Sequence, residues 1–402
     1  MSFNWKEFDL YNPTPEHAML RETMKSFTDS EIEPQAHKFD REEKFNLELF
    51  RKVGELGLLG ITVPEQFGGA GMDASAAVIV HEEMSASDPG FCLAYLAHSM
   101  LCVNNLAING SDEQRQKFLP KLCSGEWVGS MSMSEPAVGT DVLGMQTTAV
   151  KKGNDYILNG RKMWITNGTI DENNTPGDLT LVYAKTGEKN GRALISTFIV
   201  EKSHSGFSVG QKIKDKLGMR GSNTAELVFE NCVVPAANLI GHEGDSVLHM
   251  MRNLELERLT LAAMSLGIAR RSIEIMNRYA AEREAFGKPL NHFGQVQRYI
   301  ADSYAEYKSA RAYVYETARR MDLNHEGNRL DSDGVKLVAT TMGKNVADRA
   351  IQVLGGYGYV GEYVVERLWR DAKLLEIGGG TLEAHQKNIT RDLARAPEML
   401  NK

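Results

Sequence analysis

Five residues of one segment recur at helical spacing, and one of them is an acid. They are Met250, Leu254, Glu257, Leu261 and Met264, at intervals of four, three, four and three. Residues so spaced share one face of an α-helix, so Glu257 would lie on an apolar seam. Burial raises the pKa of a carboxyl group and enables it to accept a proton near pH 7. The seam predicts Glu257 as a general base; the alternative is a structural acid that reaches the helix edge or pairs with Arg258.

A run of three glycines is the second candidate. Gly378, Gly379 and Gly380 precede Thr381, which could cap a helix. Bare N–H groups at the start of a helix favour an oxygen that gains negative charge. Beside a buried carboxylate, such donors would suit the removal of a proton next to a carbonyl group. A flexible turn is the alternative.

Two segments in the middle of the chain have the residues of a flavin site. Met131–Asp141 is a loop with hydroxyl and bare backbone groups, and Lys162–Gly168 contributes Trp164. An indole can stack on a flat ring system. The alternative for the indole is burial in a β core. Together the two segments indicate a flavin.

A GxGxxG string, Gly356–Gly361, does not predict a dinucleotide fold. That fingerprint requires a preceding strand and a βαβ unit, whereas Val335–Leu354 has a helical pattern. We expect Gly355 and Gly356 to end a helix and to allow another molecule close to the backbone.

Composition limits the class of protein. The chain has 402 residues and a net charge of −7, which argues against nucleic acid as a partner. No histidine or cysteine spacing predicts a metal site, and we expect the four cysteines to be buried, reduced thiols. We expect no membrane span. Met1–Pro13 lacks the pattern of a targeting segment, so we expect a cytoplasmic protein.

The pattern of elements predicts an α+β protein with three parts. Helices are expected over 1–127, with one run from His17 to Phe39, an antiparallel β unit over 128–242, and helices again over 243–402. The predicted strands are Asp155–Leu158, Leu179–Thr186, Leu194–Glu201 and Ala225–Val234, with an Asn159-Gly160 hairpin turn after the first. The later helices are expected at about 245–283, 293–323, 332–355 and from Thr381.

Several of these motifs resemble one family, the acyl-CoA dehydrogenases. They are Ser134–Asp141, Lys162–Gly168, Glu282–Gly287, Gln352–Gly358 and Arg370–Lys373, in the family's order between about residues 15 and 395. Ala97–Asn104 and Lys216–Thr224 look most like the isovaleryl-CoA branch.

The resemblance implies the acyl-CoA dehydrogenase fold, with an N-terminal helical domain, a middle antiparallel β domain and a C-terminal four-helix bundle. It implies a homotetramer with FAD that dehydrogenates an acyl-CoA thioester between its α and β carbons. Electrons would pass to electron-transfer flavoprotein. Most members carry the base in a Tyr-Glu-Gly-Thr motif, where this chain has Gly378 and Gly379. The isovaleryl branch carries it at the position of Glu257, the residue that the seam also predicts.

The resemblance assigns further residues one by one. Those expected to bind FAD are Met131, Met133, Ser134, Trp164, Thr166, Thr381 and Glu383, with Arg283, Phe286, Gln352 and Gly356 from a neighbouring subunit. Those expected at the substrate are Leu254, Arg258, Thr140, Gly378 and Gly379.

Two departures from the family pattern stand out. Gly294, followed by Gln295, takes the place of a glutamine that contacts FAD, and Thr381–Gln386 differs from the usual Thr-Ser-x-x-x-Arg. Gly378 and Gly379 leave the acyl pocket wide, so isovaleryl-CoA or another branched acyl-CoA is the expected substrate. A bulkier aryl- or carboxyl-substituted acyl-CoA of the benzylsuccinyl type is one alternative. A flavoprotein that binds acyl-CoA without oxidising it is the other.

Overall fold

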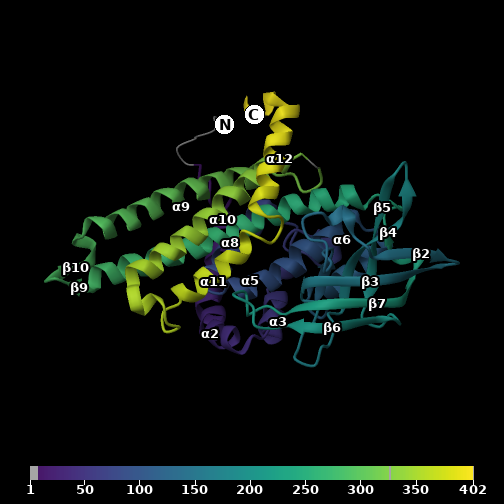
Figure 1. Ribbon diagram of the computed structural model, residues 1–402, viewed down its shortest axis with the longest axis horizontal. Coiled ribbons are helices and arrows are strands. Elements are labelled where there is room, and N and C mark those ends of the chain that lie inside the picture. Colours follow the sequence, from purple (N-terminus) through teal and green to yellow (C-terminus); the bar gives the residue numbers. More distant parts are fainter. Residues whose placement is uncertain (1–7, 326, 402) are drawn as a thin grey trace.

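The computed structural model describes residues 8–325 and 327–401, so the first seven residues of the segment Met1–Pro13 lie outside the described part. The described chain passes through helices, then strands, then helices again. Figure 1 shows the sheet at one end of an elongated molecule and the long C-terminal helices extending to the other end.

The N-terminal part is helical, as predicted. Its helices are α1 (Pro15–Phe27), α2 (Glu33–Glu42), α3 (Leu47–Glu55), α4 (Ala74–Ser85), α5 (Pro89–Leu96), α6 (Asn104–Asn109) and α7 (Asp112–Cys123). Pro15 occupies the first turn of α1, and Thr14 caps it. The single helix expected over His17–Phe39 is interrupted by a π-helical stretch, Thr28–Ile32. Every residue of α4 is buried.

One helical run contrasts with the expectation that no segment could span a membrane. Pro89–Asn109 is long and apolar enough by length and composition, and 83% of its most apolar window is buried inside the protein. The helices around this run cover its apolar side chains, as they do in the core of a globular protein.

The middle part forms one sheet of eight strands. They are β1 (Gly129–Ser132), β2 (Thr148–Lys152), β3 (Asp155–Thr166), β4 (Leu179–Lys189), β5 (Arg192–Glu201), β6 (Phe207–Ile213), β7 (Thr224–Pro235) and β8 (Leu239–Ile240). Their order is β6-β7-β3-β2-β4-β5-β8, and β1 also pairs with β4. The four predicted strands are present. Most pairs in the sheet are antiparallel, as predicted, but β1 and β2 both run parallel to β4.

The predicted hairpin at Asn159-Gly160 is wrong. β3 continues through both residues, with a change of register against β7 between Leu158 and Gly160. Gly160 does not form a turn. A glycine is needed there because Thr147 lies close to its backbone: a Cβ would be 2.4 Å from Thr147 Oγ1. The turn that joins β2 to β3 lies earlier, between Lys152 and Asp155.

The C-terminal part consists of long helices. They are α8 (Ser246–Glu282), α9 (Gly294–Arg320), α10 (Arg329–Leu354), α11 (Val365–Leu375) and α12 (Leu382–Arg395), and a small hairpin of β9 (Glu284–Ala285) and β10 (Lys288–Pro289) follows α8. The predicted helices are confirmed, and α11 was not predicted. The glycine string follows α10 with no strand before it, so it is no dinucleotide fingerprint.

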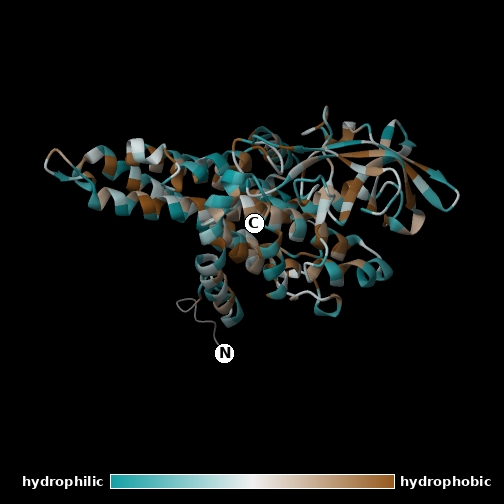
Figure 2. Ribbon diagram, turned by 90° about the horizontal axis from the view of Figure 1, so that it is seen from below, coloured by the Kyte–Doolittle hydropathy of each residue, from teal (hydrophilic) through white to brown (hydrophobic). Residues whose placement is uncertain are grey.

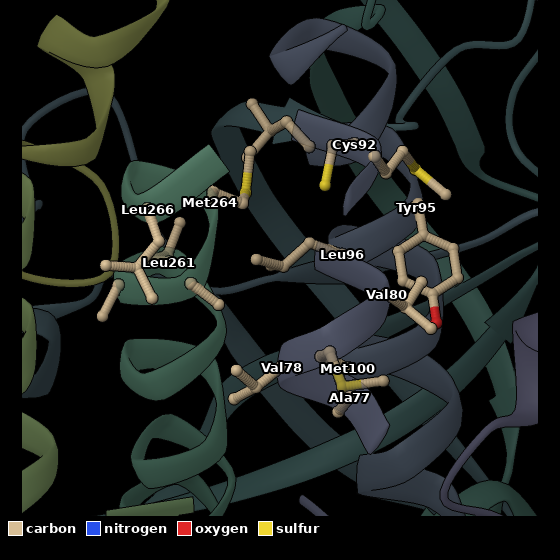
Figure 3. Close-up of a cluster of buried hydrophobic side chains, with 14 of the residues drawn as sticks. Ala77, Val78, Val80, Cys92, Tyr95, Leu96, Met100, Leu261, Met264 and Leu266 are labelled. Carbon is tan, nitrogen blue, oxygen red and sulfur yellow. The ribbon is translucent and has the colours of Figure 1, made fainter. Parts of the chain in front are cut away.

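The core joins the N-terminal helices to α8. Figure 3 shows Leu261, Met264 and Leu266 of α8 facing Val78 of α4 and Leu96 of α5. This part of α8 is buried on all sides, so side chains there have fixed positions. Figure 2 shows hydrophobic and hydrophilic residues interspersed in the sheet. Six consecutive residues are buried in each of β4, β5 and β7, so both faces of the sheet are covered there.

Candidate active site

Glu257 lies on the buried face that its spacing predicted. Its exposed fraction is 7%, and Met250, Leu261 and Met264 of the same seam are buried too. Burial raises the pKa of Glu257 to about 7, against the opposing effects of Arg258 and Lys336. Within the described residues, its Oε2 has no hydrogen-bond partner. A buried carboxylate with a free oxygen and such a pKa is able to take a proton from a bound molecule.

Arg258 forms its ion pair with another carboxylate and not with Glu257. Its Nη1 lies 3.0 Å from Asp333 Oδ1, on α10. The alternative in which Glu257 is a structural acid paired with Arg258 is therefore wrong. Leu254, one turn earlier on α8, is partly buried.

The glycine run lies directly beside Glu257. A Cβ on Gly379 would lie 3.4 Å from Glu257 Oε1 and 2.4 Å from Leu261 Cδ1, so a side chain there would require Leu261 to move. Gly379 has φ +67°, which also favours glycine. In the described part of the chain, the Gly379 N–H donates to no acceptor. The site therefore places an unused backbone donor next to an unpaired carboxylate.

Gly378 is less constrained than Gly379. The nearest atom to a Cβ there would be Leu374 O, at 3.6 Å, an ordinary van der Waals contact. Thr381 caps α12, as predicted, since its Oγ1 accepts from the Ala384 N–H at 3.3 Å. Glu383, in the first turn of α12, is exposed.

The loop after β1 reaches the same part of α8. Met131 and Met133 pack in one cluster with Met250 and Leu254. The backbone of Ser134 accepts a hydrogen bond from Met163 N–H at 2.9 Å, which joins this loop to the segment that carries Trp164. The two predicted flavin segments are thus neighbours, and both lie near the helix of Glu257.

Trp164 is on the surface of the sheet and not in its core. Its exposed fraction is 62%, and its φ is +66°, a conformation that few residues with a side chain adopt. It lies between Lys162 and Ile165, where the register of β3 against β7 shifts. Strained, exposed aromatic residues at bulges are typical of binding sites. Thr166, two residues later, pairs with Thr224 of β7 and is half-buried.

An ion pair that the sequence did not reveal fixes the loop. Lys162 and Glu135 are both buried, with Nζ and Oε1 2.9 Å apart. The Lys162 ammonium also donates to Met133 O at 3.0 Å, and Glu135 accepts from the backbone of Gln146 and Thr147. These residues belong to two quoted motifs, but only the fold shows that they pair. Thr140, within this loop, is exposed.

The remaining predicted residues lie at the far end of the bundle. Arg283 follows α8, 26 residues after Glu257, which at 1.5 Å per residue is about 39 Å along the helix. Arg283 and Gly356 line an open cavity of about 530 Å³. Phe286, at the tip of the β9–β10 hairpin, has φ +52° and is 96% exposed, and Gln352 is exposed too. Figure 1 shows this hairpin at the end of the helices away from the sheet.

The departure at Gly294 involves an open position. Gly294 begins α9, and a Cβ there would have no atom within 4 Å. Gln295 beside it is exposed. Cys92, Cys102, Cys123 and Cys232 are free and buried, as predicted. Among the residues that the structure describes, no three His, Cys, Asp or Glu side chains are grouped to hold a metal ion.

Three family models cover most of the chain. The N-terminal domain of acyl-CoA dehydrogenases matches residues 14–126, the middle domain 130–232 and the C-terminal domain 247–394. The chain belongs to the acyl-CoA dehydrogenase family, and it is an oxidoreductase with that family's fold.

Individual relatives are similar over nearly their whole length. A mitochondrial isovaleryl-CoA dehydrogenase of Arabidopsis thaliana is 46% identical over 93% of this chain and 90% of that protein. A mitochondrial 2-methylacyl-CoA dehydrogenase of Solanum tuberosum is 42% identical over 93% and 89%. Among solved structures, a chain from work on the electron transferring flavoprotein of Acidaminococcus fermentans is similar to this one. Its TM-score is 0.90 and its sequence identity 35%, over 98% of this chain and 100% of that chain.

Proposed function

We propose that this protein oxidises a branched acyl-CoA to its α,β-unsaturated thioester, with FAD as the bound cofactor. One observation carries the proposal: the carboxylate of Glu257, whose Oε2 has no partner among the described residues, lies beside Gly379, whose N–H donates to no acceptor there. Removing a proton next to a thioester carbonyl requires a base and a donor for the carbonyl oxygen at the same place. Neither a purely structural role nor a binding role requires this pairing.

The residues present fit a flavin. Trp164 offers an exposed indole in a constrained backbone, and the buried Glu135–Lys162 pair fixes the Met133–Ser134 backbone beside it. We assign Met131, Met133, Ser134, Trp164 and Thr166 to the ring, and Thr381 and Glu383 to the remainder of the cofactor. When bound, FAD supplies the two-electron acceptor for the hydrogen that leaves the β carbon.

The far set of residues serves a second subunit in this proposal. Arg283 is about 39 Å along α8 from Glu257. Gly356 lines the same cavity as Arg283, so this end of the bundle is too far from Glu257 to share its cofactor within one chain. An almost fully exposed Phe286 and an open cavity beside Arg283 favour contact with another copy and its FAD. We propose a homotetramer, with electron-transfer flavoprotein as the electron acceptor.

The chain's own groups divide the chemistry between them. The Gly379 N–H donates to the thioester oxygen and stabilises the negative charge that develops there; one such donor is typically worth about 3–4 kcal/mol. Glu257 takes the α-proton as the bond to the α carbon breaks. Leu254 and Arg258 border this place on α8, and we assign Thr140 to the CoA end. The electron pair of the broken C–H bond becomes part of the new double bond.

A panel of acyl-CoA thioesters, added without oxygen, tests this proposal. We expect isovaleryl-CoA or another branched acyl-CoA to bleach the flavin absorbance and to yield the unsaturated thioester. A preference for an aryl- or carboxyl-substituted acyl-CoA would move the assignment to the benzylsuccinyl type. If no thioester bleached the flavin although several bound, the protein would be a binder without turnover. Release of FMN, or of no flavin, would contradict the cofactor assignment.

The activity should rise with pH through neutrality. Glu257 must be ionised to accept a proton, and burial raises its pKa to about 7. Below that pH the free enzyme holds a protonated Glu257, so kcat/KM should fall tenfold per pH unit, and above it kcat/KM should level off. The measurement is kcat/KM against pH for the substrate that the panel identifies. A limb centred near pH 4.5, where an exposed glutamate titrates, would contradict a buried base.

Gly378→Tyr should narrow the acyl pocket selectively. A side chain at Gly378 meets only ordinary contacts at its Cβ, so the variant should fold. We expect kcat/KM for the branched substrate to fall more than that for butyryl-CoA, by about 1–3 kcal/mol in their ratio. Both substrates are measured in both proteins. Equal losses would mean that Gly378 does not border the branch, and a wild-type preference for butyryl-CoA would contradict the wide pocket.

A further inference from the structure

A buried lysine lies behind the glycine run. Lys336 of α10 has an exposed fraction of 0%, and its ammonium donates to Gly380 O at 2.7 Å. The preceding glycine, Gly379, adjoins the carboxylate of Glu257. Two consecutive glycines thus contact the carboxylate and the ammonium. α10 packs along α8, which brings both groups into one buried region.

The other charged and titratable groups around Glu257 come from five elements. They are Arg258 and Glu255 of α8, Asp333 of α10, Glu376 after α11, His385 of α12 and Tyr183 of β4. Most of them have a partner of their own. Arg258 and His385 both contact Asp333, Glu376 pairs with Lys373 at 2.6 Å, and Glu255 accepts from the Asn328 N–H. Tyr183 is uncharged at neutral pH, because burial raises its pKa to about 12.

Lys336 and Glu257 are the exceptions. Across residues 8–325 and 327–401, no carboxylate lies within 4.0 Å of the Lys336 ammonium, and no cation lies that close to the Glu257 carboxylate. For Lys336, Glu257 is the strongest electrostatic partner, and for Glu257, Lys336 adds to the effect of Arg258. A low local dielectric weakens such interactions between buried charges little.

We propose that Lys336 is a positioning residue for the reaction: its ammonium keeps Glu257 ionised and, through Gly380 O, holds the glycine run against α8. This inference rests on the proposed role of Glu257 as the base. His385 supports the same loop, because its Nε2 lies 3.0 Å from Gly380 O while its Nδ1 faces Asp333. The loop that carries the Gly379 donor is therefore held by two side chains, one from α10 and one from α12.

The sign of the effect follows from the charges. Burial raises the pKa of Glu257, and the positive charges of Arg258 and Lys336 oppose that rise. Without the ammonium, Glu257 stays protonated to higher pH. Burial also lowers the pKa of Lys336 to about 8, so wild-type Lys336 itself loses its charge above that pH. A neutral variant should therefore be impaired below neutrality and converge with the wild type in alkali.

The experiment compares pH profiles of kcat/KM in FAD-loaded enzyme. Lys336→Gln removes the charge and keeps a donor for Gly380 O. We expect its acid limb to shift upward by about one to three pH units, which is ten- to a thousandfold in rate at pH 6. Lys336→Arg should keep the wild-type limb. Lys344→Gln, the same change eight residues later on α10, is the matched control and should leave the profile unchanged. A Lys336→Gln loss that is equal at every pH would overturn the proposal.

A second measurement does not depend on activity. Glu257→Gln leaves the Lys336 ammonium buried without its counter-charge. Lys336→Gln should therefore lower the melting temperature less in the Glu257→Gln background than in the wild type. A Lys336→Gln variant that folds only in that background supports the pairing. Additive losses, or failure to fold in both backgrounds, would overturn it. Wild-type enzyme that bleached with no thioester would instead refute the proposed function, and the coupling would still be measurable.

Discussion

Glu257→Gln should abolish dehydrogenation and leave a folded, FAD-loaded protein. The amide has nearly the shape of the carboxylate, but it cannot accept a proton. A general base contributes about 10²–10⁴ to the rate, so we expect kcat to fall at least that far. Binding of acyl-CoA, measured by the change in flavin absorbance, should persist, because the Gly379 donor and the seam around Leu261 are unchanged.

The matched control is Glu255→Gln, two residues earlier on the same helix. Glu255 is also buried, but its Oε2 accepts the Asn328 N–H at 3.0 Å, which commits it to the loop before α10. We expect this variant to keep its turnover. More than about a tenth of wild-type turnover in Glu257→Gln, above what loss of a base allows, would place the base elsewhere, at Glu255 or at Glu376.

The sequence was sufficient to predict that Glu257 is buried, because the signal is local. A carboxylate at helical spacing among four apolar residues needs only the 3.6-residue repeat to be placed on a buried face. The glycine run was predictable for a similar reason, since Gly379 and the cap Thr381 are neighbours in the chain. What the spacing could not supply was the contact between the two, which joins residues more than a hundred positions apart.

Partners distant in sequence were missed for the same reason. Glu135 and Lys162 pair across the sheet, and Lys336 reaches the glycine run from another helix. A lysine at a helical position is ordinarily exposed, so nothing local predicted that this one is buried. The wrong hairpin at Asn159-Gly160 has a related cause: the dipeptide favours a turn, but contact with Thr147 requires a glycine within a continuous strand.

Trp164 illustrates how tertiary structure decides between two interpretations of one residue. In sequence, a tryptophan inside a strand pattern is usually a core residue. The irregular register around it turns the indole outward and gives the backbone a positive φ. No periodicity predicts that displacement, because the partner strand β7 is sixty residues away.

Stability depends on a second buried carboxylate, which the activity does not use. Glu82 of α4 has an exposed fraction of 0%. It accepts from Arg311 Nε at 2.7 Å, Arg21 Nη1 at 3.1 Å, and the hydroxyls of Tyr307 and Tyr315. These partners come from α1 and α9, so this one side chain joins three helices. Burial alone would raise the pKa of Glu82, but the arginines outweigh it and lower that pKa to about 2.

Glu82→Gln should therefore lower the free energy of unfolding by about 3–5 kcal/mol, the usual cost of removing one partner from a buried ionic group. Arg311 would lose the carboxylate that it pairs with, whereas Arg21 would keep Glu83, whose Oε1 lies 2.5 Å from its Nη1. Urea unfolding followed by circular dichroism measures the loss. Glu22→Gln, a change at an exposed acid on α1, should alter the free energy of unfolding by no more than about 0.5 kcal/mol.

The pH dependence of the stability has a definite sign. The contribution of Glu82 is complete above its unfolded pKa and is lost as pH falls from about 4.5 towards 2, so the wild type should lose more stability over that range than the variant. Equal acid sensitivity of the two proteins, or a loss no larger than that of Glu22→Gln, would mean that the arginines find other partners and that Glu82 does not hold the three helices together.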